Sequence, residues 1–394
     1  MRVTHVITRL IIGGAQENTI ASVLGLRQKP GLEVDLISGP SGGPEGSLEH
    51  VVSQVPGLLQ LVPQLVRPVH PWYDWRALGR LESIFRHSRP DIVHTHSGKA
   101  GVLGRLAAAR ADVPVIIHTV HGPSFGAFQG YFPNLIFRFA ELYAARVTSH
   151  FIVVADAMKE QYLSAGIGRS DQYTRVFSGF DLEPFLAATN DPQLRAKLGI
   201  APSDLVVGKI ARLFQHKGHD DLLAIAPAII KNCPQVKFLL VGDGEYRERL
   251  ERQVQADGLA KHFIFAGLVP PEAIAALVGV MDALVHLSFR EGLARALPQA
   301  LAAARPVVAY NCDGAKEVCL DEKTGFLVPL GNRAVLTERL LTLLRQPELR
   351  TRFGQHGRDF VRGSFSVQRM VDDLHAIYLR LNRNQNERSD LAAA

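Results

Sequence analysis

Short runs of apolar residues alternate with helical patterns along the first half of the chain. The apolar runs lie at 3–8, 34–38, 91–96, 113–120 and 151–155. Segments with helical spacing lie between them, for example at 13–28 and 101–111. Continuous apolar strands separated by helices are typical of a parallel sheet that is covered on both faces. The pattern therefore predicts an α/β fold.

The same pattern then starts again. New apolar runs lie at 204–213, 236–244, 262–267, 282–288 and 305–310, and the segment 178–192 interrupts the periodicity before them. We expect two doubly wound, Rossmann-like parallel-sheet domains, at 1–190 and 191–365, that face each other across a cleft. A helix at 366–383 is expected to return toward the first domain, and the polar tail 384–394 is expected to fray.

Composition and charge narrow the class of protein. The 394 residues carry a net charge of +6, with 47% hydrophobic and 21% charged residues, as in an ordinary globular protein. A positive charge suits anionic partners, but the basic residues do not cluster with aromatic ones as in nucleic-acid binders. The three cysteines fit neither a disulfide framework nor a CxxC site. With no signal peptide and no apolar run of about 18 residues, we expect a cytoplasmic protein.

Two loops at predicted strand ends suggest binding of phosphate, because ligands of open α/β sheets lie at the carboxyl ends of the strands. Gly13 and Gly14 follow the first strand and open a helix, where backbone can approach an anion. A plain tight turn would look the same. Arg212 and Lys217 precede another helix, and two cations there would neutralise a diphosphate, unless this is only a solvated basic loop.

Histidines at strand ends are further candidates. His121 follows a buried strand and is taken as functional, whereas His118 lies inside the strand and is taken as structural. His94 and His96 stay undecided. No H-x₃-H or HExxH spacing indicates a metal site, and no DxD carboxylate pair is present to hold Mg²⁺ beside a diphosphate. We therefore expect no metal and no cofactor.

One carboxylate, Glu291, stands where a buried strand ends and a helix is expected to begin. A carboxylate there can accept from two sugar hydroxyls, and the amides of Leu293, Ala294 and Arg295 could serve a phosphate or sugar oxygen. The alternative is that Glu291 only stabilises the helix dipole, worth roughly 0.3–1 kcal/mol. The glycines at 241–250 are interpreted as a turn in which Asp243 caps the next helix.

These motifs, taken in order, resemble the glycosyltransferase family 4, whose members are retaining enzymes of the GT-B fold. The resemblance covers nearly the whole chain and rests on "GGAQ", "PDIVHTHSGKAGVLGRLAA", "HTVHG", "RLFQHKG", "VGDGEYRERLE", "FAGLV", the loop at Glu291, "ARPVVAY" and "KTGFLV". It implies a nucleoside diphosphate sugar as donor, used without metal. The C-terminal domain would hold the nucleotide sugar and the N-terminal domain the acceptor.

The resemblance also implies roles for single residues. Gly14 would approach the donor phosphate, His121 the donor sugar, and backbone around Leu268 the base. Arg212 and Lys217 would hold the diphosphate, and Glu291 the sugar hydroxyls. Two positions depart from the family pattern. Gln299 replaces the second acid, which binds the ribose, and Ala294 replaces a glycine.

The predicted reaction transfers a sugar, with retention, from a UDP-sugar to an acceptor hydroxyl in cell-surface polysaccharide or glycolipid assembly. Aromatic residues and arginines at 125–146 form either an ordinary core helix or a surface that contacts an anionic membrane, at the inner face of the plasma membrane. Two alternatives stay open: a catalytically degenerate nucleotide- or glycan-binding partner subunit, suggested by Gln299 and Ala294, and a nucleotide-sugar epimerase of the same architecture.

Overall fold

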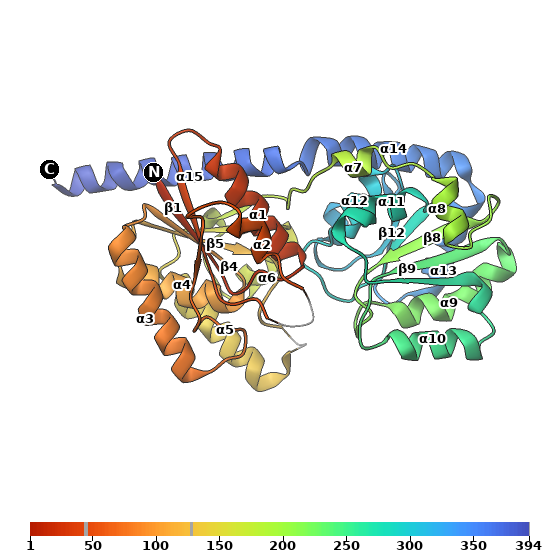
Figure 1. Ribbon diagram of the computed structural model, residues 1–394, viewed down its shortest axis with the longest axis horizontal. Coiled ribbons are helices and arrows are strands. Elements are labelled where there is room, and N and C mark those ends of the chain that lie inside the picture. The colour runs from red at the N-terminus through yellow and green to blue at the C-terminus, as the bar shows by residue number, and fades with distance from the viewer. Residues whose placement is uncertain (43–45, 127–128, 394) are drawn as a thin grey trace. The chain divides into compact units, whose positions relative to one another are not determined.

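The computed structural model describes residues 1–42, 46–126 and 129–393 (Figure 1). The chain forms two compact units. Unit 1 contains Met1–Phe180 and the helix that begins at Val367, and unit 2 contains Asp181–Ser366. The last helix therefore belongs to the same unit as the N-terminal half of the chain.

Unit 1 is built on a seven-stranded parallel sheet with the order β3-β2-β1-β4-β5-β6-β7. Its strands are β1 (Arg2–Ile7), β2 (Glu33–Ser38), β3 (Leu59–Leu61), β4 (Ile92–His96), β5 (Val115–Val120), β6 (His150–Val153) and β7 (Tyr173–Arg175). Its helices are α1 (Gly14–Arg27), α2 (Glu49–Ser53), α3 (Pro71–Ser88), α4 (Gly98–Arg110), α5 (Tyr131–Ala145), α6 (Asp156–Ser164), the 3₁₀ turn η2 (Ser170–Gln172) and α15 (Val367–Ala393).

The two-residue period of the strands divides the core of unit 1 into two layers. Val3 and Ile7 of β1 pack with α1, α2 and α15, whereas Val6 packs with α3 and α4 on the other face. His5 is fully buried in the same strand, and its position in the alternation places it on the face of Val3 and Ile7. Polar side chains on this face must therefore find partners inside the core.

Unit 2 is built on a six-stranded parallel sheet with the order β10-β9-β8-β11-β12-β13. Its strands are β8 (Leu205–Ile210), β9 (Val236–Val241), β10 (Phe263–Gly267), β11 (Ala283–His286), β12 (Val307–Tyr310) and β13 (Gly325–Val328). Its helices are α7 (Glu183–Leu186), α8 (Pro192–Lys197), α9 (His219–Asn232), α10 (Arg247–Ala256), α11 (Ile274–Gly279), α12 (Ala296–Ala302), α13 (Arg333–Arg345) and α14 (Pro347–Ser364), with 3₁₀ turns η3 (Ala260–His262), η4 (Pro271–Ala273) and η5 (Asp313–Glu317).

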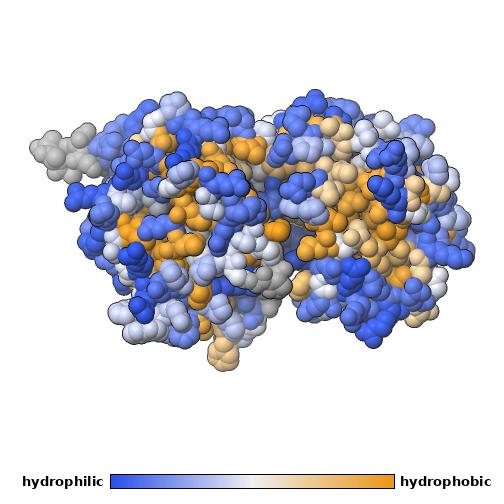
Figure 2. All heavy atoms as spheres, viewed as in Figure 1, coloured by the Kyte–Doolittle hydropathy of each residue, from blue (hydrophilic) through white to orange (hydrophobic). Residues whose placement is uncertain are grey.

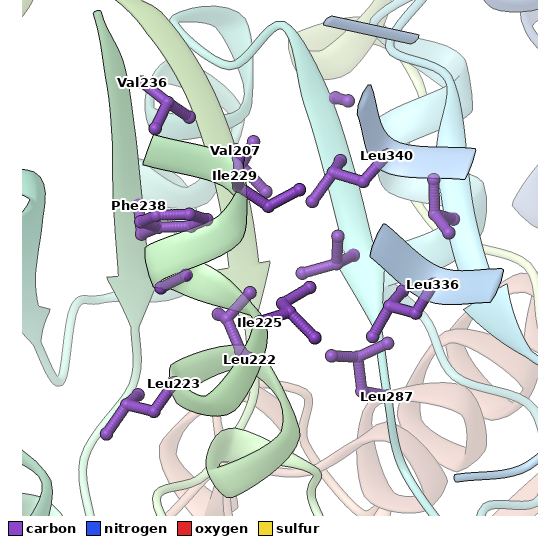
Figure 3. Packing of buried hydrophobic residues seen from close by; sticks show 14 of the residues in the cluster. Val207, Leu222, Leu223, Ile225, Ile229, Val236, Phe238, Leu287, Leu336 and Leu340 are labelled. Atoms are coloured by element: carbon purple, nitrogen blue, oxygen red, sulfur yellow. The ribbon is translucent and has the colours of Figure 1, made fainter. Parts of the chain in front are cut away.

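The core of unit 2 lies between the sheet and helices α9, α10 and α13. Figure 3 shows Leu222, Ile225 and Ile229 of α9 packed beside strand residues Val207 and Phe238, and α13 contributes Leu336 and Leu340 to the same cluster. Helices α7, α11, α12 and α14 pack with one another on the opposite side of this sheet (Figure 1). A sheet covered on both faces explains why these strands are continuous apolar runs.

The fold class predicted from the sequence is confirmed: both units are parallel sheets with helices on their two faces. The strands β3, β7 and β13 were not predicted; each has only three or four residues, and each lies at a sheet edge. The last helix, α15, continues to Ala393 and so includes most of the tail predicted at 384–394.

The surface of the protein is mixed in character. Hydrophilic side chains cover much of the face drawn in Figure 2, with hydrophobic side chains visible between them in each unit. Among the helices of the described residues, none has both the length and the apolar character needed to cross a membrane.

Candidate functional site

Two of the predicted site residues meet in unit 2. Lys217 follows β8 and Glu291 follows β11, and the Lys217 ammonium donates a hydrogen bond to Glu291 Oε1. Ser288 Oγ donates to the same oxygen at 3.3 Å. Both side chains keep some exposure, 17% for Lys217 and 28% for Glu291, so a ligand can reach them. We call these two residues the Lys217–Glu291 pair.

The pair forms because two loops touch. Gly218 has φ 68°, and a Cβ on it would lie 2.0 Å from the carbonyl oxygen of Leu287. The Phe289 amide donates to the His216 carbonyl at 2.8 Å, which joins the same two loops by their backbones. Only glycine combines this backbone conformation with so close an approach. Gly218 thus brings the loop of Lys217 against the end of β11.

The backbone at Glu291 is fixed by a third loop. The Glu291 amide donates to Asp313 Oδ2 at 2.7 Å, and Asp313 begins η5, just after β12. Helix α12 starts only at Ala296, so the prediction that a helix begins beside Glu291 is wrong. Glu291 is therefore outside the first turn of a helix, and the helix-dipole interpretation does not explain it.

Charge at the pair is controlled by burial and by neighbouring cations. Burial acts to raise the pKa of Glu291, but the Lys217 charge, His286 and the hydrogen bonds from Lys217 and Ser288 outweigh it, and the pKa is lowered. Burial lowers the pKa of His286 to about 4. At neutral pH, Glu291 is consequently a carboxylate and His286 a neutral imidazole.

Lys209 is a site residue that the sequence reasoning missed. It lies in β8 and is 1% exposed, and its Nζ has no hydrogen-bond partner among the described residues. Burial, reinforced by the Lys217 charge, lowers the pKa of Lys209 to about 7, although Glu291 and Asp221 act in the opposite direction. A lysine inside an apolar run (204–213) was the available signal, because a buried lysine is rare.

Arg212 lies in the same loop as Lys217 but is held differently. Its guanidinium stands over the Phe214 ring, 5.1 Å from the centroid, and its carbonyl accepts from His219 Nε2 at 3.0 Å. The structure gives Arg212 no hydrogen bond to Lys217 or Glu291 among the residues that it describes. The stacked guanidinium keeps its edge available for an anion.

The remaining predicted residues of unit 2 lie in two places: directly after Glu291, and directly after β10. Leu293 is half-buried, Ala294 is buried, and Arg295 directly precedes α12, which carries Gln299. Leu268 follows β10 and is 71% exposed.

The prediction that Asp243 caps α10 is wrong, because the N-cap of that helix is Tyr246. The Asp243 carboxylate accepts from the Gly244 amide at 2.8 Å and pairs with Arg247. The bond from Gly244 is the main cause of the lowered pKa of Asp243, and a backbone bond from Leu268 contributes. Asp243 therefore organises the turn that leads to Leu268.

The predicted residues of unit 1 lie at the carboxyl ends of β1 and β5. Gly13 precedes α1 and accepts from the Glu17 amide at 3.0 Å, and Gly14 is the first helical residue. His121 Nε2 is 3.1 Å from His96 Nδ1, and burial lowers the pKa of His121 to about 4. The structural role of His118 is confirmed by its bond to Thr95 Oγ1, at 2.9 Å.

His96 also belongs to a cluster of three histidines in unit 1. His5, His94 and His96 are buried, with one ring nitrogen of each within 4.8 Å of the others. The spacing motifs for metal sites did not reveal this cluster, because His5 comes from β1 and the other two from β4.

Comparison with known proteins agrees with this architecture. Residues 12–183 match the family described as Glycosyltransferase Family 4, and residues 190–360 match Glycosyl transferases group 1. The chain is 27% identical over 389 residues to the UDP-Gal:alpha-D-GlcNAc-diphosphoundecaprenol alpha-1,3-galactosyltransferase of Escherichia coli, covering 98% of both chains. It is 24% identical to the capsular polysaccharide biosynthesis glycosyltransferase CapM of Staphylococcus aureus, over 79% of this chain and 82% of that one.

Solved structures show the same fold. The Anabaena protein Alr3699/HepE in complex with UDP superposes with a TM-score of 0.81 at 21% identity, covering 96% of this chain and 100% of that one. Fold and family together define a glycosyltransferase of the GT-B type. The chain belongs to glycosyltransferase family 4.

Proposed function

We propose that the protein is a retaining, metal-independent glycosyltransferase that moves a sugar from a UDP-sugar to a hydroxyl of a lipid-linked sugar, in cell-surface polysaccharide or glycolipid assembly. The observation that carries the proposal is the Lys217–Glu291 pair, which sets a carboxylate and a cation side by side at the strand ends of unit 2. The Escherichia coli relative, whose name includes UDP-Gal and a diphosphoundecaprenol acceptor, supports this choice of donor and acceptor.

The chemistry of the pair suits the two ends of a nucleotide sugar. A carboxylate accepts several hydrogen bonds, so Glu291 can hold sugar hydroxyls while it keeps its bond to Lys217. An ammonium has three donors, so Lys217 retains donors for a phosphate oxygen. Arg212 adds a planar donor set for the diphosphate. We assign the ribose to Gln299 and the base to backbone at Leu268.

The amides of Leu293, Ala294 and Arg295 follow Glu291, and we assign them to phosphate or sugar oxygens of the donor. In unit 1, we assign Gly13 and Gly14 to the donor phosphate and His121 to the donor sugar. His121 is neutral, so it would act there as a hydrogen-bonding group and not as a cation.

Cations account for the proposed independence from metal. Negative charge develops on the departing diphosphate in the transition state, and fixed positive groups lower its energy. Lys217 and Arg212 supply such groups, and the sequence has no DxD motif to hold a divalent ion. Glu291 is already bonded to Lys217 and Ser288, which makes it a poor nucleophile, so we favour attack on the same face as the leaving group.

The test is a thermal-shift panel of nucleoside diphosphates, followed by turnover of the stabilising UDP-sugar. Glu291→Gln keeps the shape and removes the charge, and Gln299→Glu is its counterpart at the ribose position. We expect UDP to stabilise the wild type, and sugar release to fall in Glu291→Gln. Binding without turnover, or binding only in Gln299→Glu, would indicate a degenerate partner subunit. Donor conversion without transfer to acceptor or water would indicate an epimerase.

Contact with an anionic membrane is part of the proposal, at the inner face of the plasma membrane. Only Glu141 and Ala144 of α5 are buried, so the core-helix interpretation of 125–146 is wrong; residues 127–128 lie outside the described residues. The exposed apolar side chains of α5 are Tyr131, Phe132, Leu135, Ile136, Phe139 and Tyr143. Arg138, which is also exposed, donates to the Ala165 carbonyl at 3.0 Å.

Sedimentation with lipid vesicles tests this contact. We expect the protein to bind vesicles that contain phosphatidylglycerol, and the double variant Phe132→Glu, Phe139→Glu to lose that binding. Trp75→Glu changes an exposed aromatic residue of α3 and serves as the matched control. An equal loss of vesicle binding in Trp75→Glu would show that α5 is not the specific contact surface.

A further inference from the structure

A continuous chain of hydrogen bonds runs through the core of unit 1 and ends at His121. Thr119 Oγ1 lies 2.6 Å from His94 Nε2, and His94 Nδ1 lies 2.5 Å from the Tyr378 hydroxyl. That hydroxyl lies 3.2 Å from His5 Nε2. His5 Nδ1 lies 2.9 Å from His96 Nε2, and His96 Nδ1 lies 3.1 Å from His121 Nε2.

The strand register explains how these groups meet. His5 lies directly beside His94 in the pairing of β1 with β4, and His96 lies beside Thr119 in the pairing of β4 with β5. The two-residue alternation directs all of them to the face that α15 covers. Tyr378 of α15 packs into the same core layer and is fully buried.

Each ring in the chain is neutral. Burial lowers the pKa of His5 to about 3 and that of His121 to about 4. The pKa values of His94 and His96 are also lowered, by burial first and then by neighbouring histidines, and burial raises the pKa of Tyr378. A neutral imidazole has one donor nitrogen and one acceptor nitrogen. The series of hydrogen bonds therefore has a direction, in which each group donates to the next.

The same cluster does not fit a metal ion well. Two imidazole nitrogens bound to one tetrahedral Zn²⁺ at about 2.0–2.1 Å would stand roughly 3.3–3.4 Å apart. His5 Nδ1 and His96 Nε2 are closer, at 2.9 Å, as expected for a shared proton. Both nitrogens of His94 are already bonded, to Tyr378 and Thr119.

If the buried Tyr378 hydroxyl donates to one neighbour and accepts from the other, two directions are possible. In one, the Thr119 hydroxyl donates to His94, every later group donates to the next, and His121 receives at Nε2 and carries its proton on Nδ1. In the other, every bond is reversed: His121 carries its proton on Nε2, its Nδ1 is unprotonated, and Thr119 must accept from His94. His94 is the only partner of Thr119 Oγ1 among the described residues, so the reversed direction leaves a buried hydroxyl proton unpaired.

We propose that Thr119, His94, Tyr378, His5 and His96 act as a chain of positioning residues that holds His121 as the Nδ1–H tautomer. His121 Nδ1 has no partner among the described residues, so this tautomer presents a neutral donor to a ligand oxygen. The use of that donor on a nucleotide sugar rests on the proposed function, whereas the tautomer itself does not.

The test is the ¹⁵N NMR spectrum of the histidine rings at neutral pH, in the ligand-free full-length protein. We expect His121 to show a protonated Nδ1 and an unprotonated Nε2. In Thr119→Val the start of the chain is lost, and we expect the two nitrogen shifts to move toward each other. Thr119→Ser keeps the hydroxyl and should restore the wild-type pattern.

A second variant protects the test against failure of the first to fold. Tyr378→Phe removes the central hydroxyl and should mix the tautomers in the same way. A wild type with its proton on Nε2, or variants with unchanged His121 shifts, would overturn the proposal. Tight, stoichiometric binding of added Zn²⁺ that shifts His5, His94 and His96 together would also overturn it, in favour of a metal site.

Turnover of UDP-sugar separates this inference from the proposed function. We expect Thr119→Val to lower kcat by about tenfold or more, and Thr119→Ser to recover it, at equal melting temperatures. If the tautomers behave as predicted but no nucleotide sugar is used, the proposed role of the hydrogen-bond chain is supported and the proposed function is contradicted. If turnover is found but the tautomers do not respond to the substitutions, the proposed role of the hydrogen-bond chain is contradicted and the proposed function is supported.

Discussion

Replacement of Lys209 by Met should remove a pH-dependent cost from the stability of unit 2. Lys209 is 1% exposed in β8, and its Nζ has no partner among the described residues. Burial lowers the pKa of Lys209 from 10.5 to about 7. A fall of this size corresponds to roughly 5 kcal/mol of lost stability at a pH where Lys209 is charged in both the folded and the unfolded state. Met has a similar shape and no charge, so it avoids that cost.

The sign of the pH dependence follows from proton binding. Between the folded pKa, near 7, and the unfolded value of 10.5, the unfolded chain binds a proton at Lys209 that the folded chain does not bind. The cost is therefore complete below about pH 7 and is relieved as the pH rises toward 10.5. The advantage of Lys209→Met over the wild type should shrink by about 1.4 kcal/mol per pH unit in this window.

Urea unfolding at pH 7 and pH 9 measures the effect. Both tryptophans, Trp72 and Trp75, lie in α3, so their fluorescence reports unit 1, whereas circular dichroism reports both units. We expect the advantage of Lys209→Met to be about 2 kcal/mol smaller at pH 9 than at pH 7, because folded Lys209 is already half deprotonated at pH 7. Lys261→Met, at an exposed residue, controls for the loss of a positive charge. An advantage that is equal at both pH values would refute the reasoning.

Three further changes have defined outcomes. Gln299→Glu should tighten UDP binding by about tenfold or less in calorimetry, because a charged acceptor makes stronger hydrogen bonds, and unchanged affinity would contradict the assigned ribose contact. Gly218→Ala should destabilise unit 2 and abolish UDP binding, whereas Gly258→Ala, also at positive φ but in open space, should cost only about 1 kcal/mol in urea unfolding. Glu141→Gln breaks a buried ion pair with Arg105 and should lower the stability of unit 1 by about 3–5 kcal/mol, read by tryptophan fluorescence; a smaller loss would show that the pair is dispensable.

The sequence predicted the parts of the site that lie at strand ends. Lys217 and Glu291 are far apart in the chain, but β8 and β11 are neighbours in a parallel sheet, so their carboxyl ends meet at one edge. The contact itself depends on Gly218 and on the Leu287 carbonyl, and no pattern of apolar residues reveals such a fit. The sequence thus indicated which loops matter but not how they touch.

Other features depend on contacts between distant segments. His5 and Tyr378 stand near opposite ends of the chain, and they meet only because α15 packs on the sheet of unit 1. Periodicity placed His5 in a strand but did not show which face its partners occupy. The start of α12 was predicted too early, because the Glu291 amide is bound by Asp313 and not by a helical turn.

The character of α5 could not be decided from its sequence. Apolar residues at helical spacing are usually buried, and the sequence left a core helix and a membrane surface as equal alternatives. In the structure the apolar side of α5 is exposed, with Phe132 at 74% and Phe139 at 61%. Which neighbours cover a helix is a property of the tertiary fold, so periodicity alone does not settle it.

The most direct test of the proposed function is the configuration of the transferred sugar. The protein would be incubated, with EDTA present, with an α-linked UDP-sugar and a diphospholipid-linked sugar as acceptor, and the anomeric proton of the product followed by NMR. The proposal predicts an α-linked product from the wild type and at least a hundredfold slower formation by Glu291→Gln. A β-linked product, or a rate that does not depend on Glu291, would contradict it.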